Sequence, residues 1–225
     1  MQQSSEFTIL PYQPIFEKSW VRCKALAYLH SQFIDQMSQE KDIYSEKEDG
    51  YKETIELVAL FKDEVVGLID IGIYSEERTK NDLYVKDAYQ GSYVDAIAIH
   101  PDFQKLGIAQ SLWDQSIQIL KSKDVHYLTI FTRDDLPANQ FYQKNGAQLL
   151  TKHYRVKGQL KQSPYPSGKF MVDPSTQKIG ELDSQGNPLP YSPDYPHTFW
   201  VYEKEDLKLF NADSTYIERS YVLYL

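Results

Sequence analysis

The chain has 225 residues, of which 41% are hydrophobic and 25% are charged. This balance is typical of a globular protein and excludes a disordered or membrane-spanning chain. The 24 Lys and Arg residues against 32 Asp and Glu residues give a formal net charge of −8. Because non-specific nucleic-acid binding depends on clustered positive charge, we expect no nucleic-acid partner. The aromatic content is unusual, with 18 Tyr against 10 Phe and 3 Trp.

The cysteine content and the apolar runs narrow the class further. The single cysteine, Cys23, excludes a disulfide framework and a multi-cysteine metal site, and the five His show no metal-ligand spacing. We therefore expect no metal. The first residues lack the basic and apolar regions of a secretory signal, and no apolar run reaches the roughly 20 residues of a membrane helix. These features predict a cytoplasmic protein with no membrane partner.

The first part of the chain shows strand and helix periodicities in turn. Its expected elements are, in order, a strand at 7–10, a helix at 16–37, a loop at 39–52, and a hairpin of strands 55–61 and 65–74 that turns at 62–64. Gly67 and Gly72 fall inside the hairpin, where they indicate bulges or close approaches.

The pattern continues up to about residue 157. The expected elements are a polar segment at 76–90, a strand at 93–100, a helix at 108–120, a strand at 127–132, a helix at 135–145 and a strand at 148–156. The order β–α–ββ–β–α–β–α–β predicts a mixed α/β (α+β) layer structure with an antiparallel first half.

The composition changes after Lys157, which divides the chain into an expected domain over 1–157 and an extension over 158–225. Seven of the 11 Pro lie between Pro164 and Pro196. Strands are expected at 198–202 and 216–225. Tyr carries an apolar face and a polar tip, so the eight Tyr from Tyr154 onward suit half-wet surfaces and interfaces. We expect the extension to pack on the core and to determine substrate specificity or to form subunit contacts. In the second case the protein would be a homodimer.

The segment after the strand at 93–100 carries the clearest chemical signal. It reads Gln104-Lys105-Leu106-Gly107-Ile108-Ala109 and leads from a strand into a helix. The first N–H groups of a helix have no intrahelical partner and favour an anion, and Gly107 lets a ligand approach the backbone. The segment suits a pyrophosphate, although an ordinary strand–turn–helix junction would read the same on the glycine alone.

Two motifs together resemble the GNAT family of acetyl-CoA-dependent N-acetyltransferases. The segment 104–109 is similar to the family's Q/R-x-x-G-x-G/A signature. The helix at 135–145, which carries Ala138, Phe141 and Tyr142 and is followed by Gly146, is similar to its N-x-x-A-x-x-F-Y-x-x-x-G-F pattern. Asp135 stands where the family has Asn, and Ala147 stands where it has an aromatic residue. Asn139 could supply an amide one turn after Asp135.

The resemblance implies a GNAT-like mixed central sheet with splayed central strands, flanking helices and a β-rich C-terminal extension. It implies acetyl-CoA as co-substrate, in the gap beside the strand at 93–100, with a backbone N–H near Ile99 polarising the thioester carbonyl. The residues implied to bind it are Ile97, Ala98, Ile99, Gln104, Lys105, Leu106, Gly107, Ile108, Ala109, Asp135, Asn139 and Tyr142. Tyr142 matches the family position that hydrogen-bonds the sulfur of coenzyme A.

Acetyl transfer to an ammonium group requires that the nitrogen lose a proton. Asp95 starts the expected central strand and, by alternation, shares a face with Ile97 and Ile99. It is a candidate base, directly or through water, or an anchor for the ammonium group. The alternatives are a solvated strand-end carboxylate or the partner of a basic residue. His100 is expected to cap a loop, and Asp135 to cap a helix.

We therefore predict an enzyme that moves an acetyl group from acetyl-CoA to a primary amine by direct attack. The net charge favours a small cationic acceptor over an acidic one. The alternative is a catalytically silent acyl-CoA-binding module with a regulatory or interaction role. Turnover with a panel of amines discriminates between the two.

Overall fold

The structure of the protein is a computed structural model that describes residues 7–86, 89–161, 168–195 and 197–225. Residues 87–88 of the expected polar segment and 162–167 and 196 of the expected extension lie outside these ranges. The chain forms two compact units. The first unit is made of Met1–Asn81, Asp87–Ile130 and Tyr224–Leu225, and the second of Asp82–Lys86 and Phe131–Leu223. The expected division at residue 157 stays a prediction.

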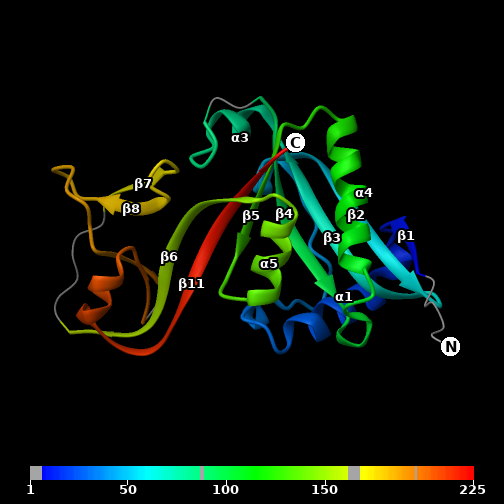
Figure 1. Cartoon of the computed structure of the whole chain (residues 1–225), viewed down its shortest axis with the longest axis horizontal. Helices are drawn as coiled ribbons and strands as arrows, with labels where there is room; N and C mark the ends of the chain where they lie inside the picture. Colours follow the sequence, from blue (N-terminus) through cyan, green and yellow to red (C-terminus); the bar gives the residue numbers. More distant parts are fainter. Residues whose placement is uncertain (1–6, 87–88, 162–167, 196) are drawn as a thin grey trace. The chain divides into compact units, whose positions relative to one another are not determined.

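The first unit is built on a mixed β-sheet (Figure 1). Its strands are β1 (Thr8–Pro11), β2 (Tyr51–Phe61), β3 (Glu64–Tyr74), β4 (Gly91–Ile99) and the first residues of β5 (Tyr127–Thr132). They lie in that order and pair antiparallel, except that β4 and β5 are parallel. The mixed sheet and its antiparallel first half are the ones that the sequence predicts.

The β2–β3 hairpin is confirmed, and its turn has a simple local cause. Lys62 and Asp63 both have positive φ, at 47° and 66°. Two such residues form the tight turn whose twist matches that of the strands it joins. β2 is longer than the alternating segment at 55–61. It begins at Tyr51, which pairs with Tyr74 at the far end of β3.

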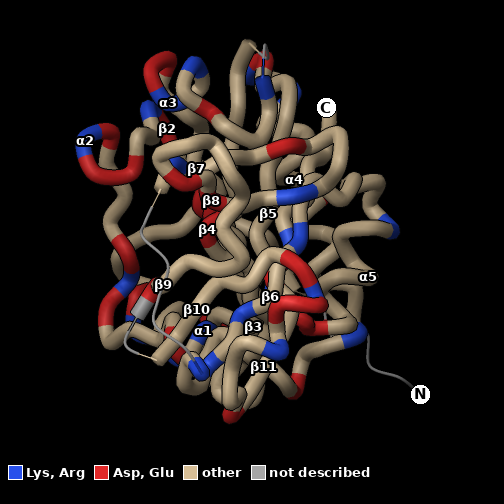
Figure 2. Tube along the Cα trace, turned by 90° about the vertical axis from the view of Figure 1, so that its left-hand side faces the viewer, with Lys and Arg blue, Asp and Glu red and all other residues tan. Residues whose placement is uncertain are grey.

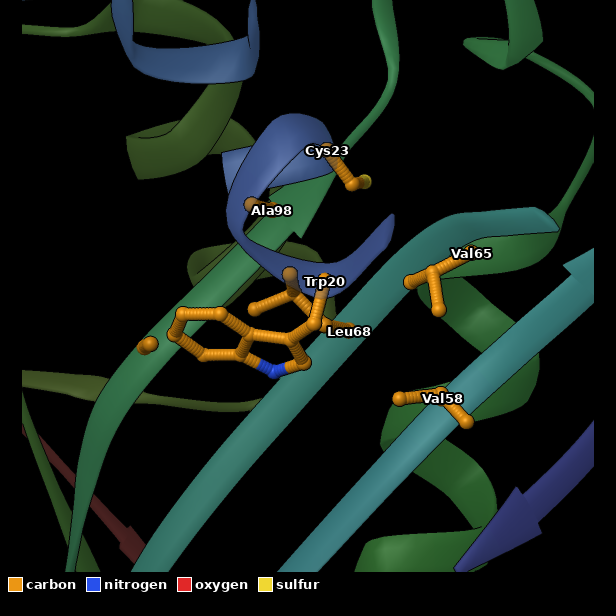
Figure 3. Close-up of a cluster of buried hydrophobic side chains, with 7 residues drawn as sticks. Trp20, Cys23, Val58, Val65, Leu68 and Ala98 are labelled. Atoms are coloured by element: carbon orange, nitrogen blue, oxygen red, sulfur yellow. The ribbon is translucent and has the colours of Figure 1, made fainter. Parts of the chain in front are cut away.

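Helices cover both faces of this sheet. The helical segments of the first unit are η1 (Pro14–Phe16), α1 (Glu17–Tyr28), η2 (Ile34–Gln36), α2 (Glu46–Asp49), α3 (Glu76–Lys80), η3 (Pro101–Phe103) and α4 (Ile108–Ser122). On one face Trp20 and Cys23 of α1 pack on Val58, Leu68 and Ala98 of the strands (Figure 3). On the other face Ile108 and Leu112 of α4 pack closely against Gly67. A side chain at this position would collide with them.

The helix expected at 16–37 is wrong in its second half. The α-helix ends at Tyr28, and Ile34 and Met37 are 49% and 40% exposed rather than part of the apolar face. Ser31 explains the end. Its hydroxyl donates to the carbonyl of Tyr28 at 3.1 Å and accepts from the N–H of Phe33 at 3.0 Å. A serine side chain that bonds nearby backbone groups offers an alternative to the helix ladder.

The described residues of the second unit form one α-helix, one 3-10 helix and a set of antiparallel strands. Its elements are α5 (Leu136–Lys144), β6 (Gln148–Leu160), β7 (Lys169–Asp173), β8 (Lys178–Leu182), β9 (Tyr191–Tyr195), β10 (Thr198–Val201), η4 (Lys204–Leu209) and β11 (Phe210–Tyr224). Four strands pair in the order β11-β6-β10-β9, and β7 pairs with β8. Tyr191, Phe199 and Phe210 form an aromatic core with ring centroids 4.9–5.7 Å apart.

The chain is thus a mixed α/β protein with a β-rich C-terminal part. Lys and Arg residues are interspersed with Asp and Glu residues in Figure 2, with both signs side by side along α2 and α3. Among the described residues, no helix combines the length and the apolar character that crossing a membrane requires. The same residues contain no group of three His, Cys, Asp or Glu side chains that could hold a metal ion.

Gly72 is a position where the sheet should tolerate no side chain. A methyl group there would lie 2.4 Å from the ring carbons of Tyr51. We expect Gly72→Ala to lower the free energy of unfolding by about 1–3 kcal/mol, because the rigid ring must move. Urea denaturation measures the loss. Gly180→Ala is the matched control, since a methyl group there would meet the Tyr202 ring at an ordinary 3.8 Å. An equal loss in both variants would contradict the explanation.

Candidate active site

The central feature of the described part of the first unit is the second half of β4, which has a strand partner on one side alone. Within the described residues, β4 pairs with β5 over Gly91–Val94 and Tyr127–Ile130, and the register goes no further although β4 continues to Ile99. The second half of β4 is therefore paired on its β3 side alone. This is the separation of central strands that the resemblance implies.

Two backbone amides in this half of β4 point away from β3. The N–H of His100 donates to the carbonyl of Val66 at 2.9 Å, so His100 and Val66 form a hydrogen-bonded pair of the β3–β4 ladder. In an antiparallel ladder such pairs alternate with pairs whose N–H groups point outward. Ile97 and Ile99 occupy the outward positions, whereas Ala98 directs its amide to β3. The geometry favours Ile97 and Ile99 over Ala98 as donors to a ligand.

The N-terminus of α4 is open and uncapped. Gly107 is its N-cap residue with φ +84°, and no side chain caps the helix. Nothing lies within 4 Å of the position that a Cβ of Gly107 would take. Lys105 also has positive φ, at 63°, and residues 104–107 are exposed. Gly107 thus leaves space for a ligand beside the start of α4, and a helix N-terminus is an arrangement that binds phosphate groups.

Asp95 lies on a β-bulge in the middle of β4. The β3–β4 register steps from Asp70↔Ala96 to Ile71↔Val94, which leaves Asp95 without a partner across the ladder. The expectations that Asp95 starts the strand and shares a face with Ile97 and Ile99 are both wrong. The extra residue breaks the alternation, so the Asp95 side chain lies on the face opposite to that of Ile97 and Ile99. There its carboxylate meets the hydroxyl of Tyr51, whose ring lies over Gly72.

The electrostatics of Asp95 suit a base. The side chain is exposed, but the protein around it removes enough water to raise the pKa of Asp95 to about 7. The Tyr51 hydroxyl and the Arg78 guanidinium oppose this rise, and the Asp70 carboxylate adds to it. A carboxyl group with a pKa near 7 can take up a proton at neutral pH.

The sequence did not indicate the tyrosines that surround Asp95. Tyr51 stacks on Tyr74 at 6.1 Å and meets Tyr44 edge-on at 6.0 Å. The Arg78 guanidinium lies 4.5 Å from the Tyr51 ring and 4.2 Å from the Tyr74 ring. Part of the Tyr excess therefore forms one wall beside the bulge. Neither periodicity nor a motif marks these residues, because they come from a loop and from separate strands.

The second unit holds the other motif residues. Asp135 is the N-cap of α5 and accepts a hydrogen bond from the N–H of Ala138, as expected. The Asn139 amide donates to the carbonyls of Arg133 and Asp135, each at 2.7 Å, and accepts from the Tyr221 hydroxyl at 2.8 Å. Asn139 is therefore engaged inside this unit. Its role toward a ligand stays a prediction.

Tyr142 is buried in the second unit, with 4% of its surface exposed. Its ring packs beside Phe141 at 5.7 Å and Tyr221 at 6.3 Å. The helix that carries it ends at Asn145, and Gly146 follows with φ +88° as the expected left-handed residue. The local structure around the second motif is therefore the one that the sequence predicts.

Two further residues, Cys23 and His100, lie outside the chemistry, and His100 caps a turn as the sequence predicts. Cys23 is fully buried, and burial raises the pKa of its thiol to about 12, which leaves it protonated. His100 caps η3, because its Nδ1 accepts from the N–H of Asp102 at 3.2 Å.

A central strand paired on one side, outward amides and a helix start without a side-chain cap, on a mixed α/β sheet, are the features that the resemblance to the GNAT family implies. The model of the acetyltransferase (GNAT) family matches residues 18–147, more than half of the chain. The chain belongs to this family.

Solved structures show the same fold at low sequence identity. A GNAT-family acetyltransferase from Streptococcus pneumoniae is 13% identical with a TM-score of 0.55, covering 98% of this chain and 100% of its own. The ribosomal-protein-S18-alanine N-acetyltransferase of Escherichia coli is 11% identical with a TM-score of 0.50, covering 97% and 94%. No curated protein matches the sequence.

Proposed function

We propose that the protein is an N-acetyltransferase that transfers the acetyl group of acetyl-CoA to a primary amine of a small cationic molecule by direct attack. The observation that carries the proposal is the bulge of β4, where Asp95 precedes the outward amides of Ile97 and Ile99 on the same strand. Acetyl-CoA supplies the activated acetyl group.

Three features of the first unit have a role in this proposal. The Gln104–Ala109 segment and the first turn of α4 hold the pyrophosphate, for which Gly107 leaves the space. The amides of Ile97 and Ile99 donate to the carbonyl oxygen, where negative charge grows as the nitrogen attacks. Asp95 takes a proton from the ammonium group, directly or through one water. The amine nitrogen then bonds the acetyl carbon, and the carbon–sulfur bond breaks. Coenzyme A leaves as a thiolate, which takes up the second proton that the nitrogen loses.

Tyr142 and Asn139 enter the proposal through the family motif. Tyr142 donates a hydrogen bond to the departing sulfur, and Asn139 and Asp135 shape the helix end that carries it. The proposal of a cationic acceptor rests on the formal net charge of −8 and on the acidic side chains beside β4. The cytoplasmic location and the homodimer stay predictions.

Release of coenzyme A in the presence of a panel of primary amines tests the function. We expect turnover with at least one cationic amine, and acetylated product in equal amount. Tight binding of acetyl-CoA without turnover on any amine would support the silent acyl-CoA-binding module instead.

The pyrophosphate site has a matched control inside the chain. Gly107 and Gly186 have nearly equal positive φ, +84° and +86°, and neither has an atom within 4 Å of the position that a Cβ would take. Gly107→Ala and Gly186→Ala therefore impose the same backbone strain, about 1–2 kcal/mol. We expect Gly107→Ala alone to weaken acetyl-CoA binding, by about tenfold, because the methyl group enters the space for the phosphates. Calorimetric titration of both variants measures it, and equal affinities would contradict the assignment.

A further inference from the structure

The segment between η2 and α2 has an inverted pattern of burial. Within 34–43 every residue is exposed except Lys41, which is 7% exposed. The apolar Ile43 of the same segment is 91% exposed. Lys is almost never fully buried unless it is paired, so a buried Lys41 indicates a specific binding site for its charge. This segment is therefore held to the protein by a charged group, while the apolar Ile43 faces water.

The Lys41 ammonium group occupies a site made by residues distant in sequence. Its Nζ lies 2.8 Å from Oε2 of Glu56 and 3.0 Å from Oδ2 of Asp70. The Tyr12, Tyr44 and Trp20 rings lie around it, with centroids at 4.9, 4.9 and 5.2 Å. We call the five residues Tyr12, Trp20, Tyr44, Glu56 and Asp70 the ammonium cage. Carboxylates with aromatic faces are the groups that recognise a primary ammonium ion.

The ammonium cage requires a cation. The Asp70 side chain is completely buried, and burial raises its pKa to about 6 although Lys41 opposes the rise. Burial alone would lower the pKa of Lys41, but Asp70 and Glu56 outweigh it and raise that pKa above the ordinary value. Among the described residues Oδ1 of Asp70 has no hydrogen-bond partner. The cage therefore still has an unused buried acceptor.

The ammonium cage lies next to Asp95. Asp70 pairs across the sheet with Ala96, the residue that follows Asp95. Both carboxylates act on the same tyrosine, since Asp70 accepts from the Tyr44 hydroxyl at 3.1 Å and Asp95 adds to the rise of the Tyr44 pKa. Two neighbouring carboxylate sites suit a ligand with two positive charges.

The segment that carries Lys41 is held mainly by side chains. Among the described residues, no backbone–backbone hydrogen bond outside helices and strands involves positions 37–44. The N–H of Lys41 donates to the Glu17 carboxylate at 3.3 Å, and Lys24 pairs with Asp42 at 3.0 Å. Replacing the Lys41 ammonium by another one would leave the backbone ladder of the sheet intact.

We propose that the ammonium cage is a second cation site of the acceptor, which Lys41 fills in the free protein and which receives the non-reacting ammonium group of a diamine acceptor. The reacting nitrogen belongs at Asp95, so this assignment rests on the proposed function. Binding to the cage can be measured without turnover, which keeps the two separable.

Chemical rescue of Lys41→Ala tests the cage itself. The substitution removes three carbons and the nitrogen, which n-propylammonium supplies. We expect the melting temperature of the variant to fall by several degrees and to recover with n-propylammonium as a saturable ligand, following RT ln(1 + [L]/Kd). 1-Propanol lacks the charge and tetramethylammonium lacks the N–H donors, so neither should restore it. Lys41→Gln serves as a second variant if Lys41→Ala does not fold.

Lys24→Ala is the matched control for the rescue. Lys24 is also buried, lies 5.1 Å from the Trp20 ring and pairs with a carboxylate, but that carboxylate, Asp42, is 50% exposed. We expect no saturable recovery in this variant. Equal recovery in both variants, or recovery by 1-propanol, would show that Lys41 only fastens the segment, and would overturn the proposal.

The kinetic arm compares 1,5-diaminopentane with n-pentylamine as acceptors. We expect Lys41→Ala to lower KM for the diamine by about tenfold or more and to leave KM for the monoamine unchanged, because the cage no longer has to be vacated. An equal change for both amines would overturn the two-site assignment. Absence of turnover with either amine, together with a positive rescue, would contradict the proposed function and leave the cage standing as a cation site.

Discussion

Asp95→Asn should lower kcat/KM for the amine by about 10²- to 10⁴-fold, the usual contribution of a positioned general base. The amide has the shape of the carboxylate but cannot accept the proton of the ammonium group. Asp95 lies on the bulge of β4, and the protein around it raises its pKa to about 7, so the wild-type group accepts a proton near neutral pH. Initial rates with the best amine of the panel measure the effect.

The pH dependence of the same variant separates a base from an anchor. Below a pKa of about 7 the carboxylate becomes protonated, so kcat/KM of the wild type should fall about tenfold for each pH unit. The Asn variant should lose this slope. Asp114→Asn, an exposed carboxylate on α4, is the control and should keep both the rate and the slope. A variant that keeps the wild-type slope would show that Asp95 is not the titrating base.

The stability of Asp95→Asn provides a check on folding. A carboxyl group whose pKa is raised in the folded state favours folding below its unfolded pKa of 3.8, and this contribution is lost as the pH rises through about 7. The neutral amide of the Asn variant does not titrate, so the stability of the variant does not fall in this way as the pH rises. The variant should therefore melt no lower than the wild type at pH 8, which rules out unfolding as the cause of lost activity.

The sequence predicts the elements whose signals are local. The alternation on both sides of Lys62 and Asp63 predicts the β2–β3 hairpin, and Gly107 and Gly146 mark helix ends that the structure confirms. Strand lengths are predicted less well. β6 runs on from the expected end at residue 156 to Leu160, because its polar end pairs with β11, about 50 residues later in the chain.

The candidate site is predictable only where a motif marks it. The extra residue at Asp95 follows from the register of β4 against β3, which no local pattern reports. The ammonium cage joins a loop lysine to side chains from α1 and two strands, and such a contact depends on tertiary packing. A lysine within a polar stretch is expected to be exposed to solvent, so the sequence does not predict the burial of Lys41.

Tyr142→Phe should lower kcat by about 10- to 100-fold, the value of a hydrogen bond of about 1.5–3 kcal/mol to a charged group. The Tyr hydroxyl, with an ordinary pKa near 10, does not give its proton fully to a thiolate whose ordinary pKa is near 8.5. A shared hydrogen bond is therefore the stabilising interaction. Tyr142 is 4% exposed, and its ring is fixed beside Phe141 and Tyr221, so the phenyl group should fill the same space.

Two comparisons isolate that hydroxyl. Coenzyme A should bind more weakly to Tyr142→Phe than to the wild type, whereas desulfo-coenzyme A, which lacks the sulfur, should bind both equally. Tyr202→Phe removes another tyrosine hydroxyl of the second unit, one that is bonded to Ser192, and should leave kcat unchanged. If both ligands lose the same affinity on Tyr142→Phe, the residue supports the packing of α5 and does not contact the sulfur, because only a direct contact discriminates between ligands that differ in that one atom.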